Sequence, residues 1–237
     1  MGDGMSDRTS LIVGEDGIGR LRNASVILCG VGAVGGYVLE GLVRAGVGRI
    51  RVVDKDEFSE SNLNRQILAT TQTIGVRKVD AACDRARMIN PYIDIQGLDM
   101  LVSDETIPGI LEGDFDVLID AIDTVRMKVL LLQAACDKGN RTFSSMGAAL
   151  HVDATAIRVA PVMKTRVCPL AANVRKNLRD RDHSNITCVY SEETPLSCKG
   201  DRDEFGKSVL GSMPTIPAIF GMTLANEAIM HILRKDD

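Results

Sequence analysis

Four polar side chains gather in a short part of the chain: Asn62, Arg65 and Gln66 in the stretch SNLNRQ, and Lys78 shortly after it. Arginine offers a two-pronged fork to a phosphate, and lysine offers a movable point charge. Taken singly, Arg65 and Lys78 fit solvated helix charges better. Together the four side chains are the kind of set that neutralises a terminal pyrophosphate, so they indicate a nucleoside triphosphate as ligand.

A glycine-rich turn precedes this set. Gly30, Gly32 and Gly35 form a GxGxxG pattern that follows one apolar run and opens a stretch of helical composition. Glycines let the backbone approach a phosphate closely, and the free N–H groups of a helix start favour negative charge. Asp54 ends the next apolar run, about 20 residues further on, where an acid can accept hydrogen bonds from a ribose. The turn indicates a nucleotide without separating NAD from ATP, and the cations favour ATP.

Two aspartates follow a third apolar run, in the segment DAIDTVRMK. Open α/β sheets bind ligands at the carboxyl ends of their strands, so we expect Asp123 to point into the same crevice as the glycine turn. Magnesium on phosphate chains is commonly held by only one or two carboxylates, and Asp123 is a candidate for one of them. For Asp120 we expect a structural role, the capping of the following helix.

The elements that position these residues alternate between strands and helices. Apolar runs predict strands over 25–29, 49–53, 116–119, 156–160 and 188–191. Helical composition or periodicity predicts helices over 34–45, 76–89, 125–138, 171–181 and 216–233, and the polar segment 192–212 predicts a loop. We therefore expect an α/β, Rossmann-like βαβ fold with a mostly parallel sheet. Residues 1–237 form one domain in this reading, with a core over 8–160 and a C-terminal elaboration over 161–237.

The bulk composition fits a water-soluble globular protein. The net charge is −4 and 45% of the residues are hydrophobic, which argues against a uniformly basic nucleic-acid coat. We find neither an apolar run near the length of a membrane helix nor an apolar signal core, so we expect a cytoplasmic protein without membrane contact. The six scattered cysteines lack any CxxC pair, so a four-thiolate zinc site has no support.

Several motifs together resemble the ubiquitin-activating-enzyme-like adenylyltransferases, a superfamily that includes the ThiF and MoeB proteins. The motifs are GVGAVGG, VVDKDEFSESNLNRQ, TIGVRKVD, RARMINP and DAIDTVRMK. The resemblance implies that ATP is the cofactor, that a carboxylate attacks its α-phosphate, and that pyrophosphate leaves. It also implies that the ATP site is lined by Gly32, Asp54, Asp56, Asn62, Arg65, Lys78 and Asp123, with Arg65, Lys78 and Asp123 as the catalytic residues.

A second set of motifs resembles a narrower family, the tRNA threonylcarbamoyladenosine dehydratases. The set comprises GEDG, SSMGA, the segment from Lys164 to Arg179 around CPLA, VYSEETP and GSMP. This family adenylates the threonine carboxylate of a modified adenosine in tRNA, after which the carbamoyl group closes a ring and expels AMP. The chain departs from the family at Cys168, where an aspartate is usual, and that departure puts the local substrate pocket in question.

The resemblance also bears on partners. Arg8 resembles an N-terminal arginine that reaches the ATP of a neighbouring subunit, which implies a homodimer. Between Lys164 and Arg181, six basic residues and one acid leave a net charge of +5. Such a segment suits contact with a phosphate backbone, although a solvated helix face is the common alternative. The candidate tRNA-contacting residues are Lys164, Arg166, Arg175, Lys176 and Arg179.

Other functions remain open on the sequence alone. The main alternative is adenylation of the C-terminus of a ubiquitin-like sulfur carrier, with Cys168 or Cys188 forming a thioester; the sequence leaves open whether Cys188 or Cys198 is reactive. An NAD-dependent redox enzyme would leave the cationic set unexplained, and a nucleotide sensor without catalysis is a fourth reading. The sequence also leaves open a monovalent-cation site and a sulfur-relay protein partner.

Overall fold

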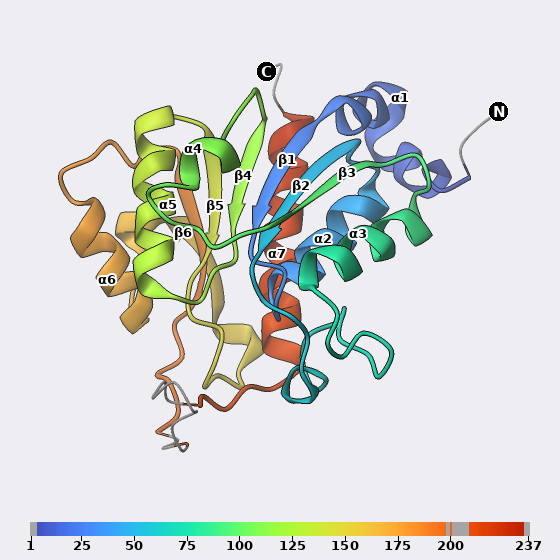
Figure 1. Cartoon of the computed structure of the whole chain (residues 1–237). Coiled ribbons are helices and arrows are strands. Elements are labelled where there is room, and N and C mark those ends of the chain that lie inside the picture. Colours follow the sequence, from blue (N-terminus) through green and yellow to red (C-terminus); the bar gives the residue numbers. More distant parts are fainter. Residues whose placement is uncertain (1–3, 198–199, 201–208, 235–237) are drawn as a thin grey trace.

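The computed structural model describes residues 4–197, 200 and 209–234. It contains one seven-stranded sheet with the strand order β3-β2-β1-β4-β5-β7-β6, in which every neighbouring pair is parallel except β6 and β7 (Figure 1). The strands are β1 (Ser25–Cys29), β2 (Arg49–Asp54), β3 (Asp94–Asp99), β4 (Val117–Asp120), β5 (Arg141–Ser145), β6 (Ile157–Pro161) and β7 (Ile186–Ser191). The predicted α/β fold with a mostly parallel sheet is confirmed.

Helices cover both faces of the sheet. The helices are α1 (Asp7–Asn23), α2 (Gly35–Ala45), α3 (Lys78–Ile89), α4 (Ile107–Ile110), α5 (Val125–Lys138), α6 (Pro169–Leu178) and α7 (Thr215–Leu233). The main core lies between the sheet and α2, α3 and α7, where Val26 and Leu28 of β1 face inward. Ile27 and Cys29 face the opposite side and pack with α4 and α5. This alternation of side-chain direction explains why β1 is apolar throughout.

Three elements were missed by the hydrophobic patterns: the helix α1, the strand β3 and the four-residue helix α4. The helix α1 has a polar average composition and a kink at Gly14, where φ is 71°. The strand β3 has the sequence DIQGLD, in which Ile95 is the one buried residue. Because β3 is an edge strand with little apolar surface to bury, its sequence lacks the apolar run that marks the inner strands.

The helix α7 corrects the expectation about apolar runs. It has 19 residues with a mean hydropathy of 1.4, which is long and apolar enough to cross a membrane by length and composition alone. In the fold it lies behind the sheet and packs against α2, with Phe220, Leu224 and Ala228 buried in the main core (Figure 1). Part of the apolarity of α7 is therefore accounted for by its packing in the domain core, where 44% of the apolar window is buried.

The C-terminal part of the chain is built into the same sheet. The boundary expected after residue 160 falls at the end of β6, whose partner β7 lies between β5 and β6. The basic helix predicted over 171–181 is α6, which begins at Pro169, and its buried residues Ala171, Val174 and Leu178 pack toward α5 and β7. Residues 161–234 thus complete the sheet and its core as well as carrying the basic segment.

Candidate active site

The glycine turn joins β1 to α2, and its glycines serve different purposes. Gly30 has a φ of 90°, and a side chain on Gly35 would begin 1.8 Å from the carbonyl oxygen of Gly30, so the turn itself requires both. A side chain on Gly32 would meet no atom closer than 3.7 Å. The fold therefore has room for a methyl group at Gly32, and the missing side chain there suits the close approach of a ligand.

The start of α2 is open to an anion. Its N-cap residue, Val34, makes no side-chain capping hydrogen bond, and the first turn contains no acidic residue. The first N–H groups of a helix have no partner within the helix, and the helix dipole adds positive potential there. The turn and the helix start therefore have the composition and geometry of a phosphate-binding site.

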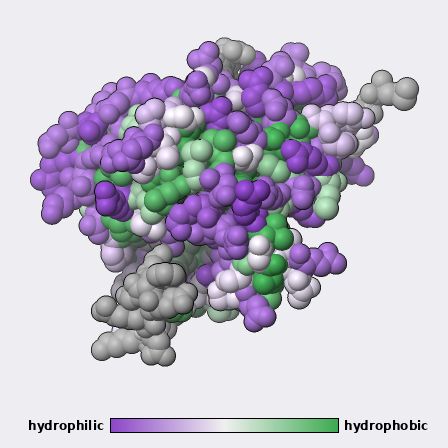
Figure 2. All heavy atoms as spheres, viewed as in Figure 1, coloured by the Kyte–Doolittle hydropathy of each residue, from purple (hydrophilic) through white to green (hydrophobic). Residues whose placement is uncertain are grey.

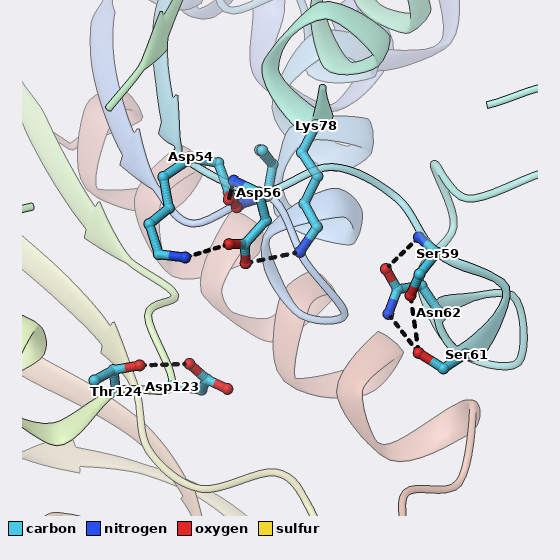
Figure 3. Close-up of polar contacts among 10 residues, drawn as sticks. Asp54, Asp56, Ser59, Ser61, Asn62, Lys78, Asp123 and Thr124 are labelled. Atoms are coloured by element: carbon cyan, nitrogen blue, oxygen red, sulfur yellow. Dashed lines mark hydrogen bonds and ion pairs between the residues drawn. The ribbon is translucent and has the colours of Figure 1, made fainter. Parts of the chain in front are cut away.

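Asp54 links the second strand to this turn. One of its carboxylate oxygens accepts a hydrogen bond from the Val31 N–H at 2.8 Å, and the other accepts one from the Asp56 N–H at 3.0 Å (Figure 3). Each carboxylate oxygen can accept more than one hydrogen bond, so both remain able to bind hydroxyl groups. Asp54 thus holds the turn in shape and remains a candidate acceptor for a ribose.

Asp56 forms ion pairs with two lysines of the site. Lys78, whose side chain is only 9% exposed, places Nζ 3.4 Å from one Asp56 oxygen, and Lys55 places Nζ 2.5 Å from the other (Figure 3). Burial tends to raise the pKa of Asp56, but the hydrogen bonds and charges of Lys55 and Lys78 outweigh burial and lower it. Asp56 is consequently ionised at neutral pH and holds both ammonium groups at this edge of the sheet.

Lys55 was missed by sequence reasoning. The pKa of its ammonium group is raised first by the hydrogen bond to Asp56, with further contributions from the charges of Asp54 and Asp123. The charges of three aspartates, which come from two different strand ends, therefore act on this one cation. The signal in the sequence was its place inside VVDKDEF, directly after the ribose-type acid.

The SNLNRQ stretch forms a short 3-10 helix, η1 (Glu60–Asn62), and the turn after it. The Asn62 side-chain oxygen accepts a hydrogen bond from the Ser59 N–H at 3.1 Å and so caps this turn (Figure 3). Arg65 donates from Nη1 to the Ser61 carbonyl oxygen and to the Asn64 side-chain oxygen, both at 2.8 Å. Asn62 and Arg65 thus make hydrogen bonds within their own loop.

Gln66 is the member of this set whose hydrogen bonding is incomplete. It is 7% exposed, and its side-chain oxygen is buried without a hydrogen-bond partner. The same oxygen is the atom nearest to the space beside Gly32. A buried acceptor without a donor is costly, so this geometry fits a ligand that supplies the missing donor.

The two aspartates at the end of β4 and in the loop after it have different environments. Asp123 is exposed, accepts a hydrogen bond from the Thr124 hydroxyl at 3.1 Å, and lies on the loop facing Asp56 in Figure 3. The expectation that Asp120 caps the next helix is wrong: the N-cap of α5 is Thr124, and Asp120 forms a fully buried ion pair with Lys128. The strand end leaves Asp120 pointing into the core, where it needs a cationic partner.

The donor set suits magnesium held mainly by phosphates. Among the described residues, no three His, Cys, Asp or Glu side chains are grouped so as to hold a metal. Magnesium in nucleotide sites typically uses one or two carboxylates together with phosphates and water. The exposed carboxylate of Asp123, at the sheet edge, fits that arrangement.

The basic segment divides into tied and solvent-facing residues. Arg175 donates from Nη1 to the carbonyl and hydroxyl oxygens of Thr165, both at 2.8 Å, and so fastens α6 to the preceding turn. Arg166 lies 3.1 Å from Glu192. Lys164, Lys176 and Arg179 are exposed, and Figure 2 shows a hydrophilic margin on the side of the molecule where α6 lies.

The cysteines give little support to a thioester. Cys168 and Cys188 are 2% and 0% exposed, and burial raises the pKa of the Cys188 thiol to about 12. A buried thiol with a raised pKa is a poor nucleophile. Cys198 lies outside the described residues.

Arg8 lies far from the chain's own candidate site. It is exposed in the first turn of α1, and Figure 1 shows α1 at the end of the sheet opposite the η1 loop. The residues brought together at the carboxyl edge are therefore the glycine turn, the three aspartates, the two lysines and the SNLNRQ stretch.

Comparison with known proteins agrees with this geometry. The ThiF family model matches residues 6–237. The tRNA threonylcarbamoyladenosine dehydratase of Bacillus subtilis is 34% identical, covering 96% of this chain and 94% of its own length. The crystal structure of the Escherichia coli enzyme TcdA in complex with ATP has a TM-score of 0.89 at 27% identity, covering 99% of this chain and 97% of that one.

A sulfur carrier protein adenylyltransferase of Thermus thermophilus is 38% identical, but over only 52% of this chain and 45% of its own length. The dehydratase likeness thus extends over nearly the whole chain, whereas the carrier-activating likeness covers about half. Because the family model spans nearly every residue, the chain belongs to the ThiF family.

Proposed function

We propose that this protein is an ATP-dependent tRNA threonylcarbamoyladenosine dehydratase. The observation that carries the proposal is the gathering of a phosphate-binding turn, an acid for the ribose and a set of cationic donors at one edge of the sheet. The full-length similarity to the Bacillus subtilis enzyme supports the substrate, a threonylcarbamoylated adenosine in tRNA. The similarity to a structure that contains ATP supports the cofactor.

In the first half of the reaction, an oxygen of the threonine carboxylate attacks the α-phosphorus of ATP. An O–P bond forms, the bond to the β-phosphate bridging oxygen breaks, and pyrophosphate leaves with that electron pair. The N–H groups of the glycine turn hold the phosphate chain, while Lys78 and Arg65 turn from Asp56 and Ser61 to the leaving group. Bound magnesium, held by Asp123, would neutralise further phosphate charge.

In the second half, the neighbouring carbamoyl group attacks the activated acyl carbon. The ring bond forms, the carbamoyl group loses a proton, and AMP leaves with the former carboxylate oxygen. That oxygen is the one lost in the net dehydration. Adenylation is needed because a free carboxylate is a poor electrophile with a poor leaving group, whereas AMP is a good one.

The tRNA is bound, in this proposal, by the cations Lys164, Lys176 and Arg179. Replacing Lys176 and Arg179 together by Gln should lower tRNA affinity and reduce the slope of log K against log salt by about 0.9 for each phosphate that is no longer neutralised. Arg181→Gln is the matched control, since Arg181 already pairs with Asp137. An unchanged salt slope in the double variant would assign this helix face to the solvent.

We also propose a homodimer in which Arg8 reaches the partner's ATP. The place of α1 at the far end of the sheet, and the exposure of Leu11 and Ile12 at 82% and 86%, support an interface on that helix. We propose a cytoplasmic location, which the proposed tRNA substrate supports. A monovalent-cation site and a sulfur-relay partner remain proposals without support from the described geometry.

The alternative function is adenylation of a ubiquitin-like sulfur carrier, favoured by the half-chain match to the Thermus thermophilus enzyme. Pyrophosphate exchange into ATP separates the two functions. Exchange that requires threonylcarbamoylated tRNA selects the dehydratase, whereas exchange driven by a protein ending in Gly-Gly selects the carrier-activating enzyme.

The decisive experiment is mass spectrometry of anticodon-loop nucleosides. Purified protein is incubated with ATP, magnesium and threonylcarbamoylated tRNA, and a product nucleoside lighter by one water is expected. Omission of ATP is the control. A nucleoside of unchanged mass in the complete mixture would refute the proposal.

A further inference from the structure

A fully buried ion pair lies beneath the loop that carries Asp123. The side chains of Lys128 and Asp120 are both 0% exposed. Asp120 is the last residue of β4 and Lys128 lies in the first turn of α5, so the pair joins the two ends of the connecting loop. Burying two charges has a desolvation cost that their attraction often only balances, so stability alone is a weak reason for such a pair.

Lys128 binds more than its acidic partner. Besides the ion pair to Asp120, its ammonium group donates to the Ser145 carbonyl oxygen at 2.8 Å and to the Ser144 hydroxyl at 3.4 Å. The Ser144 hydroxyl in turn donates to Asp120 at 2.6 Å. All three N–H donors of the lysine are thus used, and they connect the carboxyl ends of β4 and β5 to the start of α5.

Asp120 in turn holds the backbone of the 121–124 loop. Its second oxygen accepts a hydrogen bond from the Ile122 N–H at 3.1 Å, one residue before Asp123. The Ala121 N–H donates to the Cys29 carbonyl oxygen at 2.8 Å, and the Ala121 carbonyl oxygen lies 2.8 Å from where a Gly30 side chain would begin. The loop is therefore fixed on one side by the ion pair and on the other by the glycine turn.

We propose that Lys128 is a positioning residue: through Asp120 it holds the 121–124 loop so that Asp123 is presented to the magnesium ion that accompanies ATP. Lys128 and Asp120 are fully buried, so they act through Asp123 and have no direct contact with the nucleotide. The inference rests on the proposed function, because Asp123 has this role only if the site binds magnesium and ATP.

The test uses the full-length protein with ATP and magnesium chloride. The magnesium concentration that half-saturates the gain in ATP affinity is measured by calorimetry for wild type, Lys128→Met and the double variant D120N/K128M. The double variant removes both charges but keeps an oxygen that can accept from Ile122, so it remains informative if Lys128→Met alone fails to fold. Lys138→Met, in the last turn of the same helix, is the matched control.

A positioning role predicts that half-saturation rises at least about fivefold in both charge-removing variants, a size common for coupled neighbouring residues. It also predicts no further rise when Lys128→Met is added to Asp123→Asn. Unchanged half-saturation together with a lower melting temperature would make the pair merely structural, and additive effects with Asp123→Asn would also overturn the proposal. A wild-type protein that bound no ATP would refute the proposed function as well, and the two failures are thereby distinguished.

Discussion

A substitution at Gly32 should affect ATP binding while leaving the stability of the fold nearly unchanged. In the Gly32→Ala variant the new methyl group has no neighbour closer than 3.7 Å, and the backbone φ lies outside the left-handed region. The folded protein should accept this methyl group, and the stability change should stay within about 1 kcal/mol because alanine also restricts the unfolded chain.

ATP binding should respond in the opposite way. The methyl group would occupy the open space over the Gly32 backbone, where the phosphate chain is expected to approach. Losing one hydrogen bond to a charged group costs about 1.5 to 3 kcal/mol. At about 1.4 kcal/mol for each factor of ten, ATP affinity should fall roughly ten- to a hundredfold.

Isothermal titration calorimetry and thermal unfolding on the same preparation measure both quantities. Gly35→Ala is the contrasting variant, because its methyl group would begin 1.8 Å from the Gly30 carbonyl oxygen and should destabilise the fold itself. A Gly32→Ala protein that binds ATP as tightly as wild type would show that the phosphates bind elsewhere. A large loss of stability in that variant would refute the reading of open space beside Gly32.

Three further outcomes are expected. Lys78→Met should slow AMP formation, because about 2 to 4 kcal/mol of transition-state stabilisation is lost, as for other preorganised donors. A near-normal rate in a single-turnover assay would show that Lys78 does not act in the site. Cys168→Ser should keep most of its activity, since ring closure needs no thioester, and complete loss in the nucleoside assay would favour the carrier-activating alternative. Glu40 is buried, which tends to raise its pKa, but hydrogen bonds from Arg85 and Arg44 lower it below the ordinary 4.5. The stabilisation that its carboxylate contributes is therefore present above pH 4.5 and is lost as the pH falls through the folded-state pKa. The free energy of unfolding of Glu40→Gln, measured with urea, should consequently fall less steeply below pH 4.5 than that of wild type. Equal slopes for the two proteins would contradict this.

The sequence by itself determined the inner part of the fold and the parts of the site that are local in the chain. The runs 25–29, 49–53 and 116–119 are largely apolar because most of their side chains are buried in the centre of a parallel sheet, so they were readable without a structure. The glycine turn, Asp54 and the SNLNRQ stretch were found because their chemistry depends on spacing within a few residues. Edge strand β3 and helix α1 escaped detection because they bury little apolar surface.

Only the tertiary structure decided which charges meet. Asp120 and Asp123 are three residues apart, yet one is buried against Lys128 and the other is exposed at the sheet edge, because successive positions at a strand end point to different environments. Lys55 belongs to the site because of the aspartates near it, and Arg175 attaches α6 to the preceding turn through its hydrogen bond to Thr165. A charge takes its role from the dielectric and the partners around it, and those are set by residues distant in sequence.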